Sequence, residues 1–360
     1  MKSRILVLLA LLGLAACGPT DDGLALQTDY LQRLNNAVEG DGFVGFDPAQ
    51  LLRYRMPPRR QRLISIPETR IGLLELLVDV RHCPALQQQI SQRNSSLGKQ
   101  LQPSNRLGYE GDLLRALQAC LDTLQASRTQ ELQVTLSALA AQKRRQLPAV
   151  FWNALNGSPE VERYLRFADQ ALPVQPAEDT AALDALAQLA ALGSALPQRL
   201  PPSVAQLDPL FFALHSSDQG GQLITSLASL RHTLEQASLL LEHRLQHRPV
   251  CPQGKPTPAG RILQNIFVKF YAGGLQPYLA RVHRRGQRWS DSLRRLGEAP
   301  QIPAATRGYL LDLAGERESL WQDFQQTNDR HIRAWQQALK SCGLAPGQAG
   351  WEGQAANSDQ

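Results

Sequence analysis

LITSLASLRHTLEQASLLLEHRL occupies residues 223–245, and its leucines recur at steps of three, four and seven residues. This spacing matches the period of an α-helix, so the leucines form one apolar stripe that has to be buried against other helices. Pro249 is expected to end the helix, because proline lacks the backbone N–H that a helix interior requires. The stripe consists of Leu223, Leu227, Leu230, Leu234, Leu241 and Leu245.

Two stretches nearer the C-terminus repeat this pattern. The first stripe consists of Leu279, Val282, Trp289, Leu293 and Leu296. The second consists of Leu310, Leu313, Leu320, Phe324, Ile332, Trp335 and Leu339. Apolar stripes with steps of three and four favour antiparallel bundle packing. We therefore predict an all-α, two-lobed helical bundle with long antiparallel helices.

Shorter helical patterns fill most of the remaining chain. They cover residues 24–38, 69–82, 85–93, 104–126, 128–155 and 179–196. Pro148 is expected to bend or end the helix at 128–155. Residues 41–67 are different, because prolines and arginines crowd them, and we expect an irregular arm with a short strand at residues 63–66.

The composition is that of a globular protein. The chain has 360 residues, of which 43% are hydrophobic and 19% charged, which excludes a disordered chain. Only the first twenty residues hold a long apolar run, which excludes a protein with many membrane spans. A chain of 360 residues is long for a single hydrophobic core, so two lobes are expected. The predicted segments are a signal peptide (1–16), a lipid tether with the first helix and the arm (17–67), an N-terminal lobe (68–172), a connecting helix (173–203), a C-terminal lobe (204–343) and a disordered tail (344–360).

The N-terminus has the form of a secretory signal. Lys2 and Arg4 precede a short apolar stretch, and Leu14-Ala15-Ala16-Cys17 closes it. These four residues resemble a bacterial lipobox, which implies cleavage before Cys17 and acyl chains on the new N-terminus. Gly18 follows, where the inner-membrane retention signal of such proteins has Asp, so the resemblance implies the periplasmic face of the outer membrane. An ordinary signal peptide with a chance cysteine is the alternative.

Four cysteines remain beside Cys17, and in an oxidising compartment an even number indicates two disulfides. Three connectivities are possible. If the flanking helices fold back as hairpins, each sequential pair lies across a turn, near residues 101 and 296. This geometry predicts Cys83–Cys120 and Cys251–Cys342. A zinc site is the alternative, but the chain has no CxxC spacing.

Arginines line one face of the helix predicted around residues 279–296. They are Arg281, Arg284, Arg285, Arg288 and Arg295. Guanidinium groups suit phosphates and carboxylates, so phospholipid headgroups, lipopolysaccharide, peptidoglycan or an acidic protein patch are candidate ligands. The alternative is a solvated face with ion pairs to Asp291 or to neighbouring helices. The arginines between Arg53 and Arg62 could similarly lie on a membrane surface. Nucleic acid is not an expected partner.

A polar turn is the second candidate site. It contains Arg93, Asn94, Ser95, Ser96 and Lys99. Ser96 and Lys99 match the Ser-x-x-Lys motif of penicillin-binding enzymes, in which the lysine takes the serine proton. The Ser-Asp-Asn and Lys-Thr-Gly motifs that would accompany it do not occur. The turn could instead contact a ligand, or serve only as a hairpin connection.

The histidines give weaker signals. His243 and His247 have the helical spacing of a metal-binding pair, but both point away from the leucine stripe, so a solvated pair is the alternative. Residues 215–218 contain triad residue types, although neighbours in sequence do not make triad geometry. We therefore predict no metal, no cofactor and no catalytic set.

Several motifs together resemble a known family. They are the lipobox, Arg70-Ile71-Gly72-Leu73-Leu74, Cys83, residues 92–99, Gln146-Leu147-Pro148 with Trp152-Asn153, and Phe267-Val268-Lys269-Phe270-Tyr271 with Gln276-Pro277-Tyr278-Leu279. The combination resembles an uncharacterised family of proteobacterial lipoproteins, classed as a domain of unknown function. The resemblance implies location and length, and no activity. The expected function is a non-enzymatic envelope adaptor or ligand-binding lipoprotein. The alternative is an envelope hydrolase or transferase with Ser96 as nucleophile.

Overall fold

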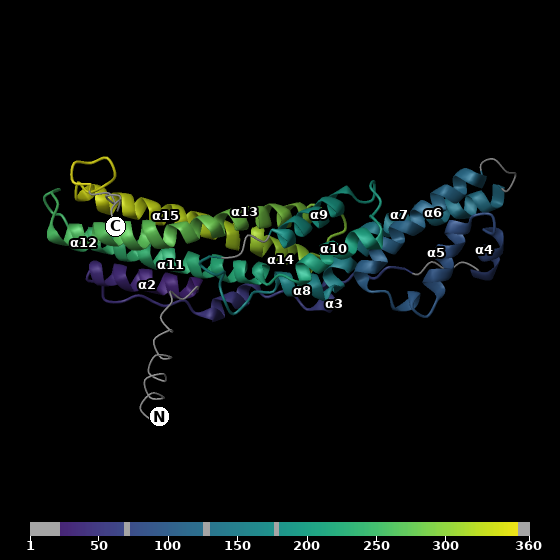
Figure 1. The fold of residues 1–360 in the computed structure, drawn as a ribbon, viewed down its shortest axis with the longest axis horizontal. Helices are drawn as coiled ribbons and strands as arrows, with labels where there is room; N and C mark the ends of the chain where they lie inside the picture. Colours follow the sequence, from purple (N-terminus) through teal and green to yellow (C-terminus); the bar gives the residue numbers. More distant parts are fainter. Residues whose placement is uncertain (1–21, 68–72, 125–129, 176–179, 352–360) are drawn as a thin grey trace, which may run out of the picture.

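The computed structural model describes residues 22–67, 73–124, 130–175 and 180–351. Within these ranges the secondary structure is helical and contains no strand, which confirms the all-α prediction. The helices form an elongated rod (Figure 1), with α12 and α15 at one end and α4 to α7 at the other. Among the described residues, no helix combines the length and the apolar character that a membrane span requires.

Three long helices build the larger part of the rod. They are α11 (Gln219–His247), α13 (Gln276–Gly297) and α15 (Leu320–Ser341). The leucines of the predicted α11 stripe from Leu223 to Leu241 are buried, as are Trp289 of α13 and Trp335 of α15, so the predicted stripes form the core. Ile332 is the exception: it is 37% exposed, and its assignment to the α15 stripe is wrong.

Helix α13 continues a longer helical segment. Helix α12 (Pro258–Ile266) leads into a π-helical stretch, η3 (Phe267–Leu275), and then into α13. Helix α14 (Ala304–Ala314) and α15 return along this segment, with Trp321 against Gly286 and Trp335 against Phe267. The two arms are therefore antiparallel, and the Cys251–Cys342 disulfide closes their open end, as predicted.

The N-terminal region packs onto this frame. Helix α2 (Gly23–Ala37) lies against α11, and η1 (Pro48–Tyr54) and α3 (Arg59–Arg62) follow. The predicted arm is thus partly helical, and the predicted strand at residues 63–66 does not form. The backbone of Ile64 instead bonds the side-chain amide of Asn153 in both directions, each at 2.8 Å, so a side chain replaces the partner strand.

The other end of the rod consists of α4 (Leu73–Asp79), α5 (Pro84–Asn94), η2 (Gly98–Gln100), α6 (Pro103–Leu124) and α7 (Gln130–Gly157). The second predicted disulfide, Cys83–Cys120, joins the start of α5 to α6. Pro148 does not end its helix, because α7 continues to Gly157. Pro148 is buried there between Leu147 and Ala149, so packing holds the helix where its backbone hydrogen bond is missing.

Three further helices fill the middle of the rod: α8 (Pro159–Leu165), α9 (Ala181–Ala195) and α10 (Val204–His215). The buried apolar side chains form one continuous cluster along the described chain. Helix α9, the predicted connecting helix, packs against both α10 and α13. The predicted lobe boundaries stay predictions.

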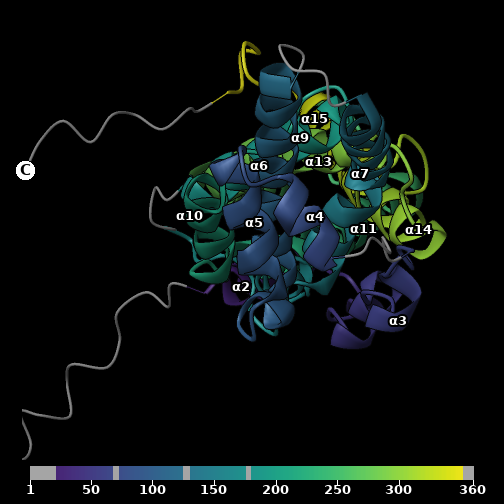
Figure 2. The same cartoon turned by 90° about the vertical axis from the view of Figure 1, so that its right-hand side faces the viewer.

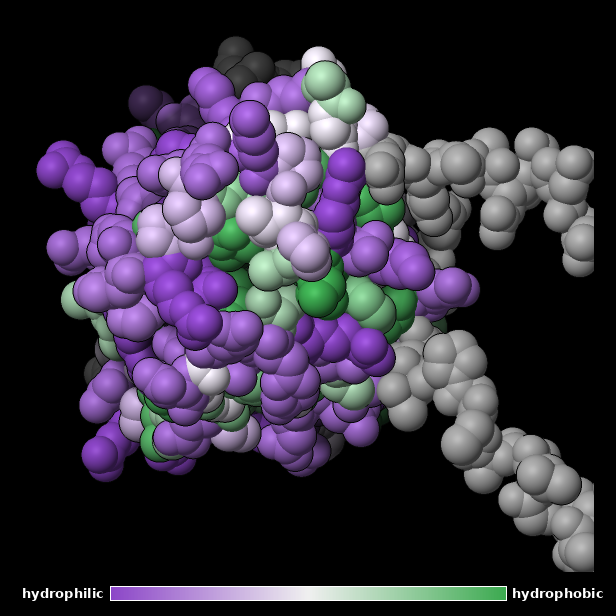
Figure 3. All heavy atoms as spheres, turned by 90° about the vertical axis from the view of Figure 1, so that its left-hand side faces the viewer, coloured by the Kyte–Doolittle hydropathy of each residue, from purple (hydrophilic) through white to green (hydrophobic). Residues whose placement is uncertain are grey.

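The described part of the C-terminal tail is ordered, so the prediction of disorder is wrong for residues 344–351. Leu344 is fully buried, and Arg261 donates a 2.7 Å hydrogen bond to the carbonyl of Gly350. Figure 3 shows this end of the rod, which is mostly hydrophilic around a small apolar patch. The remaining tail residues lie outside the described chain.

Candidate functional site

Helix α13 carries the five arginines of the sequence prediction, and four of them have partners within the fold. Arg281 donates to the carbonyl of Val174, and Arg285 donates to the side chain of Gln219. Most of this arginine face is therefore turned towards neighbouring segments of the same chain.

Of the other arginines of this face, two bond helix α9 and one is exposed to solvent. Arg288 forms an ion pair of 2.5 Å with Asp184 of α9, and the Nε of Arg295 donates to Ser194 of the same helix at 3.2 Å. Arg284 is exposed and makes no hydrogen bond or ion pair with a described residue. An anion that met this face would find one open guanidinium among arginines that already bond neighbouring segments of the chain.

A second polar stripe lies beside the arginine face on the same helix. It consists of His283, Gln287, Asp291, Arg294 and Glu298, at steps of four, four, three and four residues. These residues line a groove whose opposite wall is α14 and the start of α15, and we call it the α13–α14 groove. Its larger part encloses about 590 Å³ and its smaller part about 240 Å³. Both parts share Asp291, Arg294 and residues 314–316, so the groove is continuous.

The larger part of the groove has an apolar floor, and the smaller part is lined mainly by polar side chains. Leu293 and Leu310 are buried beneath the floor, while Leu311 is 57% exposed on the α14 wall. At the end nearer α15, Trp321 lies with its ring centroid 5.2 Å from that of His283. Trp321 fits there because Gly286 has no side chain: a Cβ on Gly286 would be 2.4 Å from the Trp321 ring. The groove therefore depends on close packing between α13 and α15.

The rim of the groove carries both signs of charge. Arg294 is paired with Asp291. Arg307, Glu298 and Glu316 are exposed, and none of them forms an ion pair with a described residue. Together with Arg295, the lining contains three arginines and three carboxylates. This rim can meet a partner that presents charges of both signs beside an apolar surface.

The comparisons with known proteins give a family. Residues 27–346 match a family described as a protein of unknown function, DUF3080. The chain belongs to the DUF3080 family. No curated protein and no solved structure matches it. The match extends from α2 into the ordered tail and includes both disulfides and the α13–α14 groove.

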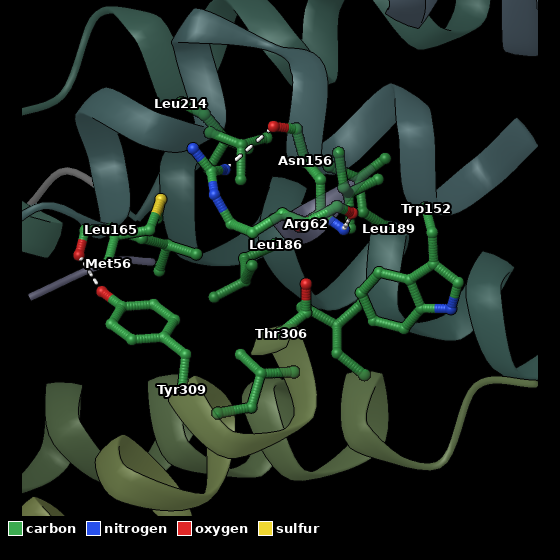
Figure 4. Close-up of a pocket in the computed structure, with 14 residues that line it drawn as sticks. Met56, Arg62, Trp152, Asn156, Leu165, Leu186, Leu189, Leu214, Thr306 and Tyr309 are labelled. Atoms are coloured by element: carbon green, nitrogen blue, oxygen red, sulfur yellow. Dashed lines mark hydrogen bonds between the residues drawn. The ribbon is translucent and has the colours of Figure 1, made fainter. Parts of the chain in front are cut away.

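The DUF3080 chain also has a small internal cavity of about 20 Å³ between α3, α7, α8, α9 and α14 (Figure 4). The buried guanidinium of Arg62 borders it and donates to the carbonyls of Pro57 and Asn156 and to Glu162. The Thr306 hydroxyl is buried there without a partner. The volume holds about one water molecule, so this cavity is part of the core and not a ligand site.

The polar turn of residues 93–99 is held together by its own side chains. Arg93 donates to the carbonyl of Gly98 at 2.6 Å, and Asn94 donates to that of Ile90. Ser95 donates to Gln92 and accepts from the Gly98 amide. Ser96 and Lys99 are exposed, and neither side chain bonds a described residue. The contacts of this turn are those of a structural connection.

The histidine candidates do not form a metal site or a catalytic triad among the described residues. His243 and His247 are exposed, with ring centroids 4.2 Å apart. Asp218 pairs with Arg163, and the Ser217 hydroxyl accepts from the Gln219 amide. The serine and the aspartate at 215–218 therefore bond other groups and do not form a catalytic triad. Across the described ranges, no group of three or more His, Cys, Asp or Glu side chains could hold a metal ion.

The arginines of the N-terminal arm mostly bond the body of the protein. Arg53 donates to the carbonyl of Glu318 at 2.9 Å, and Arg59 to that of Gly157 at 3.4 Å. Cys17, the predicted lipidation site, lies outside the described residues. The groove residues on α14 and Arg294 were not predicted from the sequence, where the only signal was the helical spacing of polar residues from His283 to Glu298.

Proposed function

We propose that this DUF3080 chain is a lipid-anchored protein of the bacterial cell envelope that works by binding a partner along helix α13. The observation that carries the proposal is the open α13–α14 groove on a rod whose first helix starts just after the lipobox. The two disulfides support an oxidising compartment such as the periplasm.

The proposed anchor constrains how the rod is held. Cys17 precedes the first residue of α2, Gly23, by six residues. An extended chain covers at most about 3.6 Å per residue, so the lipidated cysteine can be no more than about 22 Å from the start of α2. The side of the rod that carries this end of α2 would therefore lie next to the membrane.

The geometry supports binding at the α13–α14 groove better than it supports catalysis at the polar turn. The turn uses its own side chains to hold its shape, whereas the groove presents apolar surface and unpaired charges to solvent. Leu311 and the exposed carboxylates of Glu298 and Glu316 are surface that a partner can cover.

Metabolic labelling tests the anchor. We expect the full-length chain, expressed in a bacterial host with an alkyne analogue of palmitate, to be labelled and to fractionate with the outer membrane. Cys17→Ala should lose the label and the fractionation, while Ser96→Ala should keep both. An unlabelled wild-type chain, or a labelled Cys17→Ala chain, would contradict the anchor.

Mild detergent extraction tests the binding. We expect the native chain to elute from a sizing column together with a stoichiometric partner, at a larger size than the purified chain alone. Elution of the extracted chain alone would count against a binding role.

A further inference from the structure

We infer that the α13–α14 groove receives an amphipathic helical segment of a partner protein, with an apolar stripe flanked by charges of both signs. The inference rests on the proposed function and names the partner chemistry. Three observations on the groove carry it: its length, its apolar floor and the balance of its rim charges.

The length of the groove suits a helix. On α13 the lining runs from His283 to Glu298, a span of fifteen residues. At 1.5 Å per residue this is about 22 Å, or about four helical turns. A four-turn segment can bury the side chains of one face along the whole groove.

The larger part of the groove, where Leu311 is exposed, offers the apolar surface that such a face would cover. A single exposed leucine on a protein surface is ordinary. Leu311 differs because it borders a concave site above the buried Leu293 and Leu310, with the Trp321 ring farther along. A concave apolar strip with a polar rim is the usual form of a groove that binds a helix.

The rim charges distinguish a polypeptide from an anionic lipid or glycan. Arg307 and the outer nitrogens of Arg295 would attract an anion, but Glu298 and Glu316 line the same groove and would repel it. An anionic lipid headgroup or phosphorylated glycan without an amine carries one sign of charge only. A polypeptide can place a carboxylate beside Arg307 and a cation beside Glu316, so the balanced rim favours a protein segment.

The position of the groove agrees with this assignment. Figure 2 looks along the rod and shows α14 at the right of the view, with α2 and α10 towards the left. The start of α2 is where the proposed tether begins, so in this view the α14 wall of the groove lies on the other side of the rod from the tether. A partner in the aqueous compartment can reach it there.

Site-specific photocrosslinking tests the inference in the full-length, anchored chain. Benzoylphenylalanine is placed at Leu311 and, as the control, at Leu97, which is 84% exposed outside the groove. We expect an adduct from position 311 that is absent from position 97. Mass spectrometry of the crosslinked peptide should give an amphipathic segment with Asp or Glu and Lys or Arg beside its apolar stripe.

Binding of that segment, made as a synthetic peptide, then tests the groove by calorimetry. Leu311→Asp should raise the dissociation constant of the peptide about thirty-fold. This is a loss of about 2 kcal/mol of binding free energy, as expected for a contact at the centre of an interface. Arg307→Glu and Glu316→Lys should each weaken it as well. Leu97→Asp and Arg284→Glu, both outside the groove, should leave it unchanged.

Several results would overturn the inference. They are an adduct with lipid or glycan, an adduct with a second copy of this chain, a crosslinked segment of one charge sign, equal adducts at both positions, and equal binding by the Leu311→Asp variant. Palmitate labelling of the same samples separates the two proposals. A labelled chain without a groove adduct contradicts the inference alone, and an unlabelled chain with the predicted adduct contradicts only the anchor.

Discussion

A buried histidine makes the stability of this protein depend on pH. His331 on α15 is fully buried, and its Nε2 lies 2.7 Å from the hydroxyl of Tyr30 on α2. The indole N–H of Trp335 donates to the same hydroxyl at 2.8 Å and also to Nε2 at 3.2 Å, so we assign Nε2 as an acceptor that also receives the hydroxyl hydrogen of Tyr30. The imidazole is then neutral, with its hydrogen on Nδ1, which has no partner. Protonation would place a hydrogen on Nε2, which could then no longer accept from the Tyr30 hydroxyl.

Burial lowers the pKa of His331 to about 3, from an ordinary value near 6.5. The neighbouring phenols offer no negative charge to oppose this, because burial raises the pKa of Tyr271 to about 12 and also raises that of Tyr30. Below pH 6.5 the unfolded chain therefore binds a proton that the folded chain does not. Stability contributed by this group is present above pH 6.5 and is lost as the pH falls, by about 2 kcal/mol between pH 6.5 and 4.5.

Urea unfolding at these two pH values measures the effect. His331→Gln keeps an acceptor for the Tyr30 hydroxyl but cannot titrate, so its loss of stability on acidification should be smaller by about 2 kcal/mol. His247→Gln, which alters an exposed histidine, should lose as much as the wild type. If the wild type and His331→Gln lose equal stability between pH 6.5 and 4.5, the assignment of a neutral, buried imidazole is refuted.

Three further perturbations test the packing. Arg62→Met should lower the free energy of unfolding by about 3 kcal/mol, because it leaves buried carbonyls without their donor; a loss below about 1 kcal/mol in urea unfolding would contradict this. Gly286→Ala should cost about 1–3 kcal/mol and shift the fluorescence of Trp321, since the added Cβ overlaps the ring; unchanged emission and stability would show that α13 and α15 are not so closely packed. Replacing Cys251 and Cys342 by alanine should cost about 4–5 kcal/mol, because the bridge closes a separation of 91 residues; a chain with an unchanged melting temperature would argue against the bridge.

The parts of the fold that local periodicity controls could be predicted from the sequence. Leu223 to Leu241 repeat at helical steps, and their burial follows from that repeat. The two disulfides were predictable because helical hairpins place cysteines on either side of a turn. The burial of the leucines follows without knowing which helices become neighbours, and the disulfide prediction needs only that the flanking helices fold back as hairpins.

The errors arose where a distant neighbour decides the local structure. Ile64 has strand-forming neighbours, but the Asn153 side chain takes both of its backbone hydrogen bonds. Ile332 fits the apolar period of α15, yet the side of the helix on which it lies is left partly open to solvent. Leu344 follows the last helix in a polar stretch, and its burial depends on α12 lying beside it. The sequence near these residues does not contain that information.

The two polar faces of α13 show the same limit at the candidate site. Both carry polar side chains at helical spacing, five arginines on the first face and a single arginine, Arg294, on the second, so the pattern alone favours the first face as a binding site. In the fold, α9 lies along the first face, and Asp184 neutralises Arg288 there. Helix α14 borders the second face and leaves a groove beside it, and Arg307 on its wall forms no ion pair with a described residue. The partner helices, and not the arginines themselves, therefore determine which face is structural and which is free to bind.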